Sequence, residues 1–291
     1  MLKNDIHDPT WFFDLEWVPD AAGAMRLYDL PPETTELQAM ERLWADAKDY
    51  CAETNPRPFV KYLFSRVVAI SFLSRRVVFD GDRQRRVEFA INSLPKLPVQ
   101  EPRPDEGEII GKFFHYIGVR DPQLVGFNSA ESDLQVLIQR GLIHEVRADA
   151  FCVRPNKPWE GRDYFDKNGE AHLDLIKKFS IGAMKPKLND IAKLCGFPGK
   201  IDMDGAQVVD LWLEGDLRSI VEYNQIDTLN TYLVWLRFVN FCGKISEEDY
   251  ITEQDDFHAF LAAEAEREEN AHLRRFLAKW QTPEIGRAAL S

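Results

Sequence analysis

Two acidic residues, Asp14 and Glu16, interrupt an apolar and aromatic stretch, residues 10–17, whose composition predicts a β-strand buried on both faces. Side chains alternate across a strand, so the two carboxylates point to the same side, a few ångströms apart. Like charges so close raise each other's pKa unless a cation lies between them. The pair therefore indicates a divalent metal site at a strand end. The alternative is a strand that emerges into solvent, where water would solvate both acids.

A third acid, Asp133, follows a short apolar strand expected over residues 123–128 and lies in the first turns of a helix that Asn128 or Ser129 could cap. Open α/β sheets bind ligands at the carboxyl ends of their strands, which favours a functional carboxylate here. A favourable charge near a helix N-terminus is the competing interpretation.

The fourth acid, Asp227, lies on a long helix that is expected to begin at Asp216. Tyr223 precedes it by four residues, so both side chains occupy one helix face. A phenol beside a carboxylate can orient a water molecule, although a group with a pKa near 10 is a poor general base at neutral pH.

Composition places this chain of 291 residues, 45% hydrophobic, among globular proteins with one large domain or one domain and an appendage. The absence of a long apolar run and of a signal-peptide pattern predicts a cytoplasmic protein without membrane contact. Four widely separated cysteines indicate neither zinc nor disulfides. A net charge of -12 argues against broad coating of nucleic acid but allows an enzyme that grips only a chain end.

The elements that must position these acids follow from local patterns. A turn is expected over residues 18–23 and a helix over 33–51. Strands over 66–79 and 86–91, joined at Asp80-Gly81, form an antiparallel meander with the first strand. A helix is expected over 105–119, a loop over 144–170 and a last short strand over 172–175, with Asp174 fixing the geometry of strand and loop. We predict a domain over 8–243, with a helical insertion at 33–57, and a helical extension over 244–291 packed on it.

Taken in order, the motifs Phe13-Asp14-Leu15-Glu16, Asn128-x-x-x-Ser132-Asp133 and Tyr223-x-x-x-Asp227 resemble the three exonuclease motifs of the DEDD superfamily, in its tyrosine subclass. Residues 13–20, 187–198, 199–205 and 223–238 resemble the bacterial family of predicted 3'-5' exonucleases related to the proofreading domain of family B DNA polymerases. The resemblance covers about residues 11–280 and implies an RNase H-like α/β fold, a five-stranded mixed sheet flanked by helices.

The chain departs from the family pattern at two positions. Trp17 stands after the first-motif Glu, where relatives usually have Thr, and Ser132 replaces the aromatic residue before the second-motif Asp. Neither change removes a metal ligand, so both bear on substrate fit. The subclass with His in the third motif is excluded because that position is Glu222.

The resemblance implies two divalent cations, Mg2+ or Mn2+, about 4 Å apart. We expect Asp14 to bridge both ions and Glu16 with Asp227 to complete the site that activates water. Asp133 would hold the second ion directly or through water. Tyr223 would orient the attacking water.

Substrate contacts are expected from five residues. Trp17 would stack on the terminal base unless it is a core residue. The others are Leu15 between the first-motif acids, Asn128 near the 3'-terminal nucleotide, and Lys185 and Lys187 on phosphates, where a solvated surface role is the alternative. Lys157 and Arg162 are further candidates for phosphate contacts.

The predicted function is a metal-dependent 3'-5' exonuclease that removes nucleotides from single-stranded DNA or unpaired 3' ends. The same fold and metals cleave RNA, so a 3'-5' exoribonuclease is the first alternative, with DNA favoured over RNA. A non-catalytic nucleic-acid-binding module and a structural subunit of a larger assembly are the others.

Overall fold

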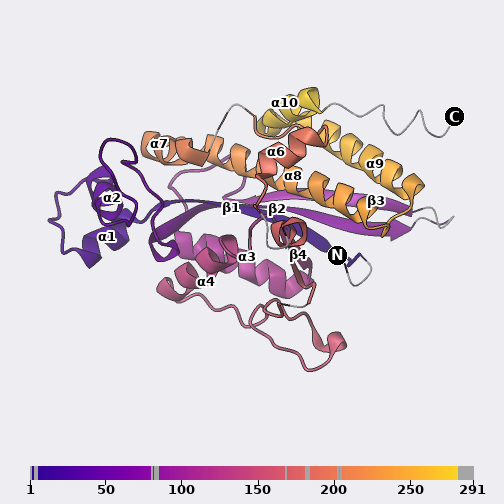
Figure 1. Ribbon diagram of the computed structural model, residues 1–291, viewed down its shortest axis with the longest axis horizontal. Helices are drawn as coiled ribbons and strands as arrows, with labels where there is room; N and C mark the ends of the chain where they lie inside the picture. The colour runs from indigo at the N-terminus through magenta and orange to yellow at the C-terminus, as the bar shows by residue number, and fades with distance from the viewer. Residues whose placement is uncertain are drawn as a thin grey trace.

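A five-stranded mixed sheet lies between two layers of helices in the computed structural model (Figure 1). The structure describes residues 2, 6–79, 81, 85–167, 169–180, 184–201, 203 and 205–280. The strand order is β3-β2-β1-β4-β5, and the strands are β1 (Thr10–Pro19), β2 (Ser65–Phe79), β3 (Arg85–Leu94), β4 (Gln123–Gly126) and β5 (His172–Asp174). This arrangement confirms the predicted α/β class and the five-stranded mixed sheet of an RNase H-like exonuclease.

The central strand β1 pairs antiparallel with β2 on one side and parallel with β4 on the other. The antiparallel pairing of β2 with β3 completes the expected meander, and β5 runs parallel to β4. Asp80 of the predicted hairpin turn lies outside the described residues, whereas Phe79 and Arg85 pair directly on either side of it. Because β1, β4 and β5 are parallel, their carboxyl ends point the same way, and the acids of the first motif, within β1, and of the second, after β4, lie toward that end.

Helices α3 (Glu106–Arg120) and α4 (Asp133–Ile143) cover one face of the sheet, and the later helices cover the other (Figure 1). These later elements are α5 (Leu175–Phe179), α6 (Leu188–Leu194), η3 (Gly205–Gln207), α7 (Val208–Glu214), α8 (Leu217–Phe241), α9 (Glu247–Ala265), η4 (Glu268–Asn270) and α10 (His272–Lys279). A short turn of helix, η2 (Pro158–Glu160), interrupts the predicted loop. None of the helices among the described residues is long and apolar enough to cross a membrane.

Alternation along β1 decides which layer each side chain meets. Phe13 and Leu15 belong to the hydrophobic cluster that also contains residues of α3 and α4. Phe12 joins the other cluster, with Tyr232 and Trp235 of α8 at ring-centroid distances of 5.1 and 4.9 Å. Asp14 and Glu16 lie two and four residues after Phe12, on the same face of the strand, so their side chains also point toward α8.

The region between β1 and β2 differs from the prediction. The turn expected over 18–23 is wrong in part, because Asp20 caps a short helix, α1 (Ala21–Leu27), by accepting a hydrogen bond from the Gly23 backbone. The helix expected over 33–51 is shorter, α2 (Glu36–Ala45), since a Thr35–Gln38 capping box sets its first turn. Both helices lie at one end of the sheet, and η1 (Tyr62–Phe64) leads from them into β2 (Figure 1).

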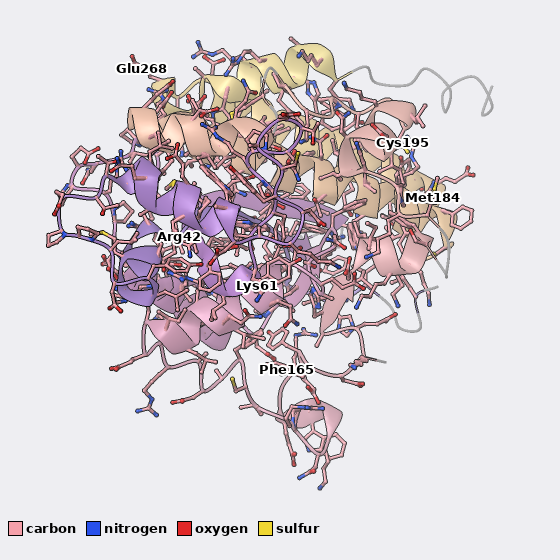
Figure 2. All side chains as sticks on the ribbon, turned by 60° about the vertical axis from the view of Figure 1, so that its left-hand side comes forward. Arg42, Lys61, Phe165, Met184, Cys195 and Glu268 are labelled. Carbon is pink, nitrogen blue, oxygen red and sulfur yellow. The ribbon has the colours of Figure 1, made fainter. Side chains whose placement is uncertain are left out.

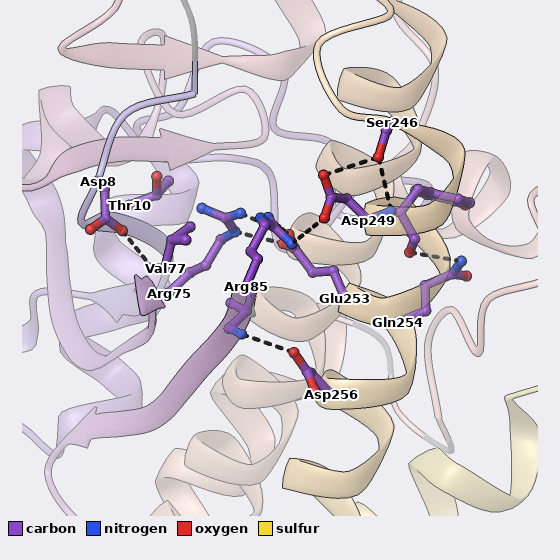
Figure 3. Close-up of polar contacts among 12 residues, drawn as sticks. Asp8, Thr10, Arg75, Val77, Arg85, Ser246, Asp249, Glu253, Gln254 and Asp256 are labelled. Atoms are coloured by element: carbon purple, nitrogen blue, oxygen red, sulfur yellow. Dashed lines mark hydrogen bonds and ion pairs between the residues drawn. The ribbon is translucent and has the colours of Figure 1, made fainter. Parts of the chain in front are cut away.

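A buried ion pair holds α9 against the sheet (Figure 3). The side chains of Arg75 on β2 and Glu253 on α9 are fully buried and form a bidentate pair with N–O distances of 2.5 and 2.7 Å. Arg85 of β3 donates a further bond of 2.7 Å to Glu253. Burial alone would raise the pKa of Glu253, but these guanidinium groups hold it below its usual range. Removing one partner of such a pair typically costs about 3 to 5 kcal/mol, so the pair ties the sheet to α9.

The edge of the sheet is covered by the same helix. Asp256 of α9 accepts a hydrogen bond of 2.8 Å from the Val87 backbone, on the edge strand β3. Phe257 of α9 and Phe276 of α10 pack into the core cluster that contains α8. We propose that these helices constitute the extension expected over 244–291, of which residues 281–291 lie outside the described residues.

Candidate active site

Three carboxylates from β1 and α8 converge at the open end of the sheet. Ligand oxygens of Asp14, Glu16 and Asp227 all lie within 4.8 Å of one another, and the three residues are partly buried. Among the described residues, β1 pairs with β4 only over Thr10 to Phe12, so the parallel pairing ends just before the first acid. The long helix α8 crosses this part of β1 and brings Asp227 to the pair.

Asp133 lies beside this group rather than within it. It begins α4 and is buried, with 4% of its surface exposed. Its carboxylate accepts a hydrogen bond from the backbone of Leu15, the residue between Asp14 and Glu16, and contacts the Ser132 hydroxyl at 2.5 Å. The second-motif acid is therefore fixed to the strand that carries the first motif.

Burial and mutual repulsion shift the titration of the whole group. Burial, followed by the charges of the neighbouring acids, raises the pKa of Asp14 and of Glu16 well above the usual carboxylate range. Burial also raises the pKa of Asp133, to about 6. Such a cluster binds protons or cations to relieve its charge, and carboxylate oxygens are the donors that Mg2+ and Mn2+ prefer. The donor set and its electrostatics fit divalent cations.

Tyr223 adjoins the same carboxylates from α8. Burial, with the charges of Asp227 and Glu16, raises its pKa above the ordinary phenol value, and its hydroxyl hydrogen-bonds to Asp227. The phenol therefore stays protonated at neutral pH. In this arrangement it can orient a water molecule but cannot remove its proton.

Two residues near the acids were not predicted from sequence. Asn224 is fully buried and donates a hydrogen bond of 2.7 Å from its amide to the Asp14 carboxylate. Lys200 lowers the pKa of Glu16, against burial and the acids that raise it, and its ammonium lies 5.4 Å from the centroid of the Tyr223 ring. A polar residue on the buried face of α8 was the available signal for Asn224, whereas nothing in the local pattern distinguished Lys200 from a surface lysine.

The five residues expected to contact substrate occupy different environments. The Leu15 side chain is buried in the core, so only its backbone faces the acids. Trp17 is partly buried. Asn128 lies 3.4 Å from the Lys185 ammonium, which pairs with Glu131. Lys187 is exposed at the start of α6. Their contacts with substrate stay predictions.

The predicted caps of α4 were wrong, and Asp174 explains the difference. Helix α4 begins only at Asp133, and its N-cap Ser132 makes no side-chain capping bond. Asn128 instead adopts a left-handed conformation with φ 65°, and its carbonyl accepts bonds from the following turn. The buried Asp174 carboxylate accepts hydrogen bonds from the Asn128 and Ala130 backbones at 2.8 and 3.2 Å. These bonds shape the turn that presents Asp133, as expected for a residue that fixes loop geometry.

A family model described as a predicted 3'-5' exonuclease related to the exonuclease domain of PolB matches residues 57–280, well over half of the chain. The chain belongs to this family. No curated protein matches it. The match to the PolB-related exonucleases includes Asp133, Tyr223 and Asp227, and it begins after Asp14 and Glu16, which the fold brings to the same place. Family membership supports a nuclease and implies nucleic acid as the substrate class.

Proposed function

We propose that the protein is a metal-dependent 3'-5' exonuclease that removes nucleotides from single-stranded DNA or from unpaired 3' ends. The observation that carries this proposal is the convergence of Asp14, Glu16 and Asp227 oxygens within 4.8 Å, on the fold of the PolB-related exonucleases. DNA is favoured over RNA because of the family's relation to a DNA polymerase domain.

Two divalent cations, when bound, would supply an activated water on one side of phosphorus and stabilise the leaving 3'-oxygen on the other. In the proposed assignment, Asp14 would serve both ions, Glu16 and Asp227 would complete the site on the side of the attacking water, and Asp133 would hold the second ion directly or through water. The hydrogen bond from Asn224 fixes the rotamer of the Asp14 carboxylate. The Leu15 backbone does the same for Asp133.

The direct test is a gel assay of the purified protein on matched DNA and RNA oligonucleotides labelled at the 5' end. With Mg2+ or Mn2+, we expect a ladder that shortens from the 3' end, faster on DNA, and no products in EDTA. A faster ladder on RNA would assign the protein to the exoribonucleases. A folded protein that binds both oligonucleotides but cleaves neither under any metal would refute the exonuclease and favour a non-catalytic module.

Replacing Tyr223 with Phe is expected to lower kcat by about 10- to 100-fold without changing metal binding. The phenyl ring preserves packing on α8, whereas the hydroxyl that contacts Asp227 is lost. This loss is smaller than the roughly 100- to 10,000-fold contribution of a general acid or base, because the phenol orients the water without taking its proton. Single-turnover kinetics measures the rate, and the rise in Tm caused by Mn2+ reports metal binding. An unchanged rate would remove Tyr223 from the proposed mechanism.

A further inference from the structure

An aromatic row that begins at Trp17 of β1 packs against the core cluster that contains residues of α3 and α4. Trp17 follows Glu16 directly, and its ring meets that of Tyr62 edge to face, with 6.3 Å between centroids. Tyr62 in turn meets Phe59 edge to face at 5.2 Å. Exposure increases outward along the row: Trp17 and Tyr62 are partly buried, and Phe59 is 62% exposed. Because most of the Phe59 ring stays in water, its burial contributes little to the stability of the folded chain.

Hydrogen bonds connect the turn that carries Tyr62 to the strand of the first acidic motif and to the helix of the second. The carbonyl of Phe64 accepts a hydrogen bond of 2.7 Å from the Asp20 backbone, just beyond β1. The neighbouring carbonyl of Leu63 accepts one of 2.9 Å from Arg140 of α4, the helix that begins with Asp133. Arg140 is itself buried and paired with Asp20 and Glu106 at 2.8 and 2.6 Å. This network makes the row a preorganised feature of the site.

Charges of both signs surround Tyr62. Burial and the carboxylates of Asp133 and Glu131 raise the pKa of Tyr62, while Lys185 lowers it, which places the ring close to that lysine. Lys61 precedes Tyr62 in the chain and is exposed, on the side of the molecule shown in Figure 2. Lys185 near the Tyr62 ring and Lys61 beside Tyr62 in the chain thus supply positive charge in a protein whose net charge is -12. Cations of this kind can follow the phosphates of a strand whose bases lie on the rings.

We propose that Trp17, Tyr62 and Phe59 form a stacking platform for the unpaired bases next to the 3'-terminal nucleotide of a single-stranded nucleic acid. This inference rests on the proposed function, since it requires a 3' end held at the carboxylates, and Tyr62 is near enough to Asp133 to feel its charge. Aromatic side chains bind bases of any sequence because every base has a π face. A base inside a duplex is stacked on both sides, so the platform would select unpaired ends.

Binding and turnover must be measured separately to test the platform. Anisotropy of a labelled dodecanucleotide, in DNA and RNA versions with Ca2+ as the only divalent ion, reports binding. Turnover with Mn2+ of the p-nitrophenyl ester of thymidine 5'-monophosphate, which has a single base, reports the carboxylate site alone. The variants are Phe59→Ala, Tyr62→Ala and Tyr62→Phe, which keeps a ring. Phe241→Ala is the matched control, because Phe241 is 73% exposed and lies 18 residues beyond Tyr223 on α8, about 27 Å at the helical rise.

We expect Phe59→Ala and Tyr62→Ala each to weaken dodecanucleotide binding by about tenfold. Tyr62→Phe and Phe241→Ala should stay within about twofold of wild type, and turnover of the ester should not change in any variant. Weaker binding of either DNA or RNA supports the platform and identifies the strand it prefers. Unchanged binding of both in a folded Phe59→Ala protein would overturn it. A wild type that binds through the row but hydrolyses nothing would refute the exonuclease and leave the platform in place.

Discussion

Replacing Asp227 with Asn is expected to abolish hydrolysis and, at the same time, to make the metal-free protein more stable. The amide keeps the shape of the side chain but removes one charge from three carboxylates whose oxygens lie within 4.8 Å. Metal ions contribute several kcal/mol to transition-state stabilisation in such sites, so kcat should fall at least about a thousandfold. Loss of activity alone would also follow from misfolding, and the stability change separates the two explanations.

The gain in stability follows from repulsion within the cluster. The charge of Asp227 raises the pKa of Glu16 and contributes to the raised pKa of Asp14, which means that ionising all three acids costs folding free energy. Each pKa unit of repulsion that the substitution removes is worth about 1.4 kcal/mol. For a chain of this size each such unit corresponds to a rise in Tm of roughly 3 to 6 °C, measured in EDTA.

The matched control is Asp255→Asn, the same chemical change at an exposed position on α9. Single-turnover rates with Mn2+ and thermal unfolding in EDTA should both equal those of wild type for this variant. An Asp227→Asn protein that remains active would remove the residue from the site. A variant that is inactive and also less stable would show that Asp227 supports the fold rather than the chemistry.

Local sequence patterns sufficed for the parts of the site that lie within one element. Strand periodicity alone places Asp14 and Glu16 on one side of β1, and in the structure both approach Asp227 of α8. Helix periodicity places Tyr223 beside Asp227, and their hydrogen bond agrees. The buried apolar strand and the Asp-Gly turn signal were enough to predict the order β3-β2-β1. No local pattern predicts that β1 and α8 meet. That expectation came from the resemblance to known exonuclease motifs.

Contacts between distant segments explain what sequence reasoning missed. Lys200 affects Glu16 only because the chain after α6 returns over Tyr223. Tyr62 adjoins Trp17 because Arg140, from helix α4, fixes the turn before β2. The caps of α4 were misassigned because Asp174, far along the chain, takes the backbone donors of residues 128 and 130. Short motifs predict residue types, but a partner that arrives from elsewhere in the fold leaves no periodic signal.

Adding Mn2+ or Mg2+ is expected to stabilise the wild-type protein, and to do so more strongly as pH rises. The folded-state pKa values of Asp14, Glu16 and Asp133 are raised, to about 6 for Asp133. The folded protein therefore binds these protons more tightly than the unfolded chain. Their stabilising contribution is complete below the unfolded carboxylate pKa of about 4 and is lost as pH rises through the folded values.

Metal binding opposes this loss because it requires the deprotonated carboxylates. At a metal concentration a hundredfold above Kd, the folded state gains about 2.7 kcal/mol, or roughly 5 to 10 °C in Tm. Thermal unfolding with and without Mn2+ should thus show a large shift at about pH 7.5 and a small one at about pH 5. In Asp14→Asn, the shift should nearly vanish at both pH values, because that residue would serve both ions in the proposed assignment.

NaCl at matched ionic strength controls for screening of surface charge. An equal metal shift at both pH values, or in Asp14→Asn, would mean that the ions bind elsewhere and that the carboxylates of β1 and α8 are not the metal site.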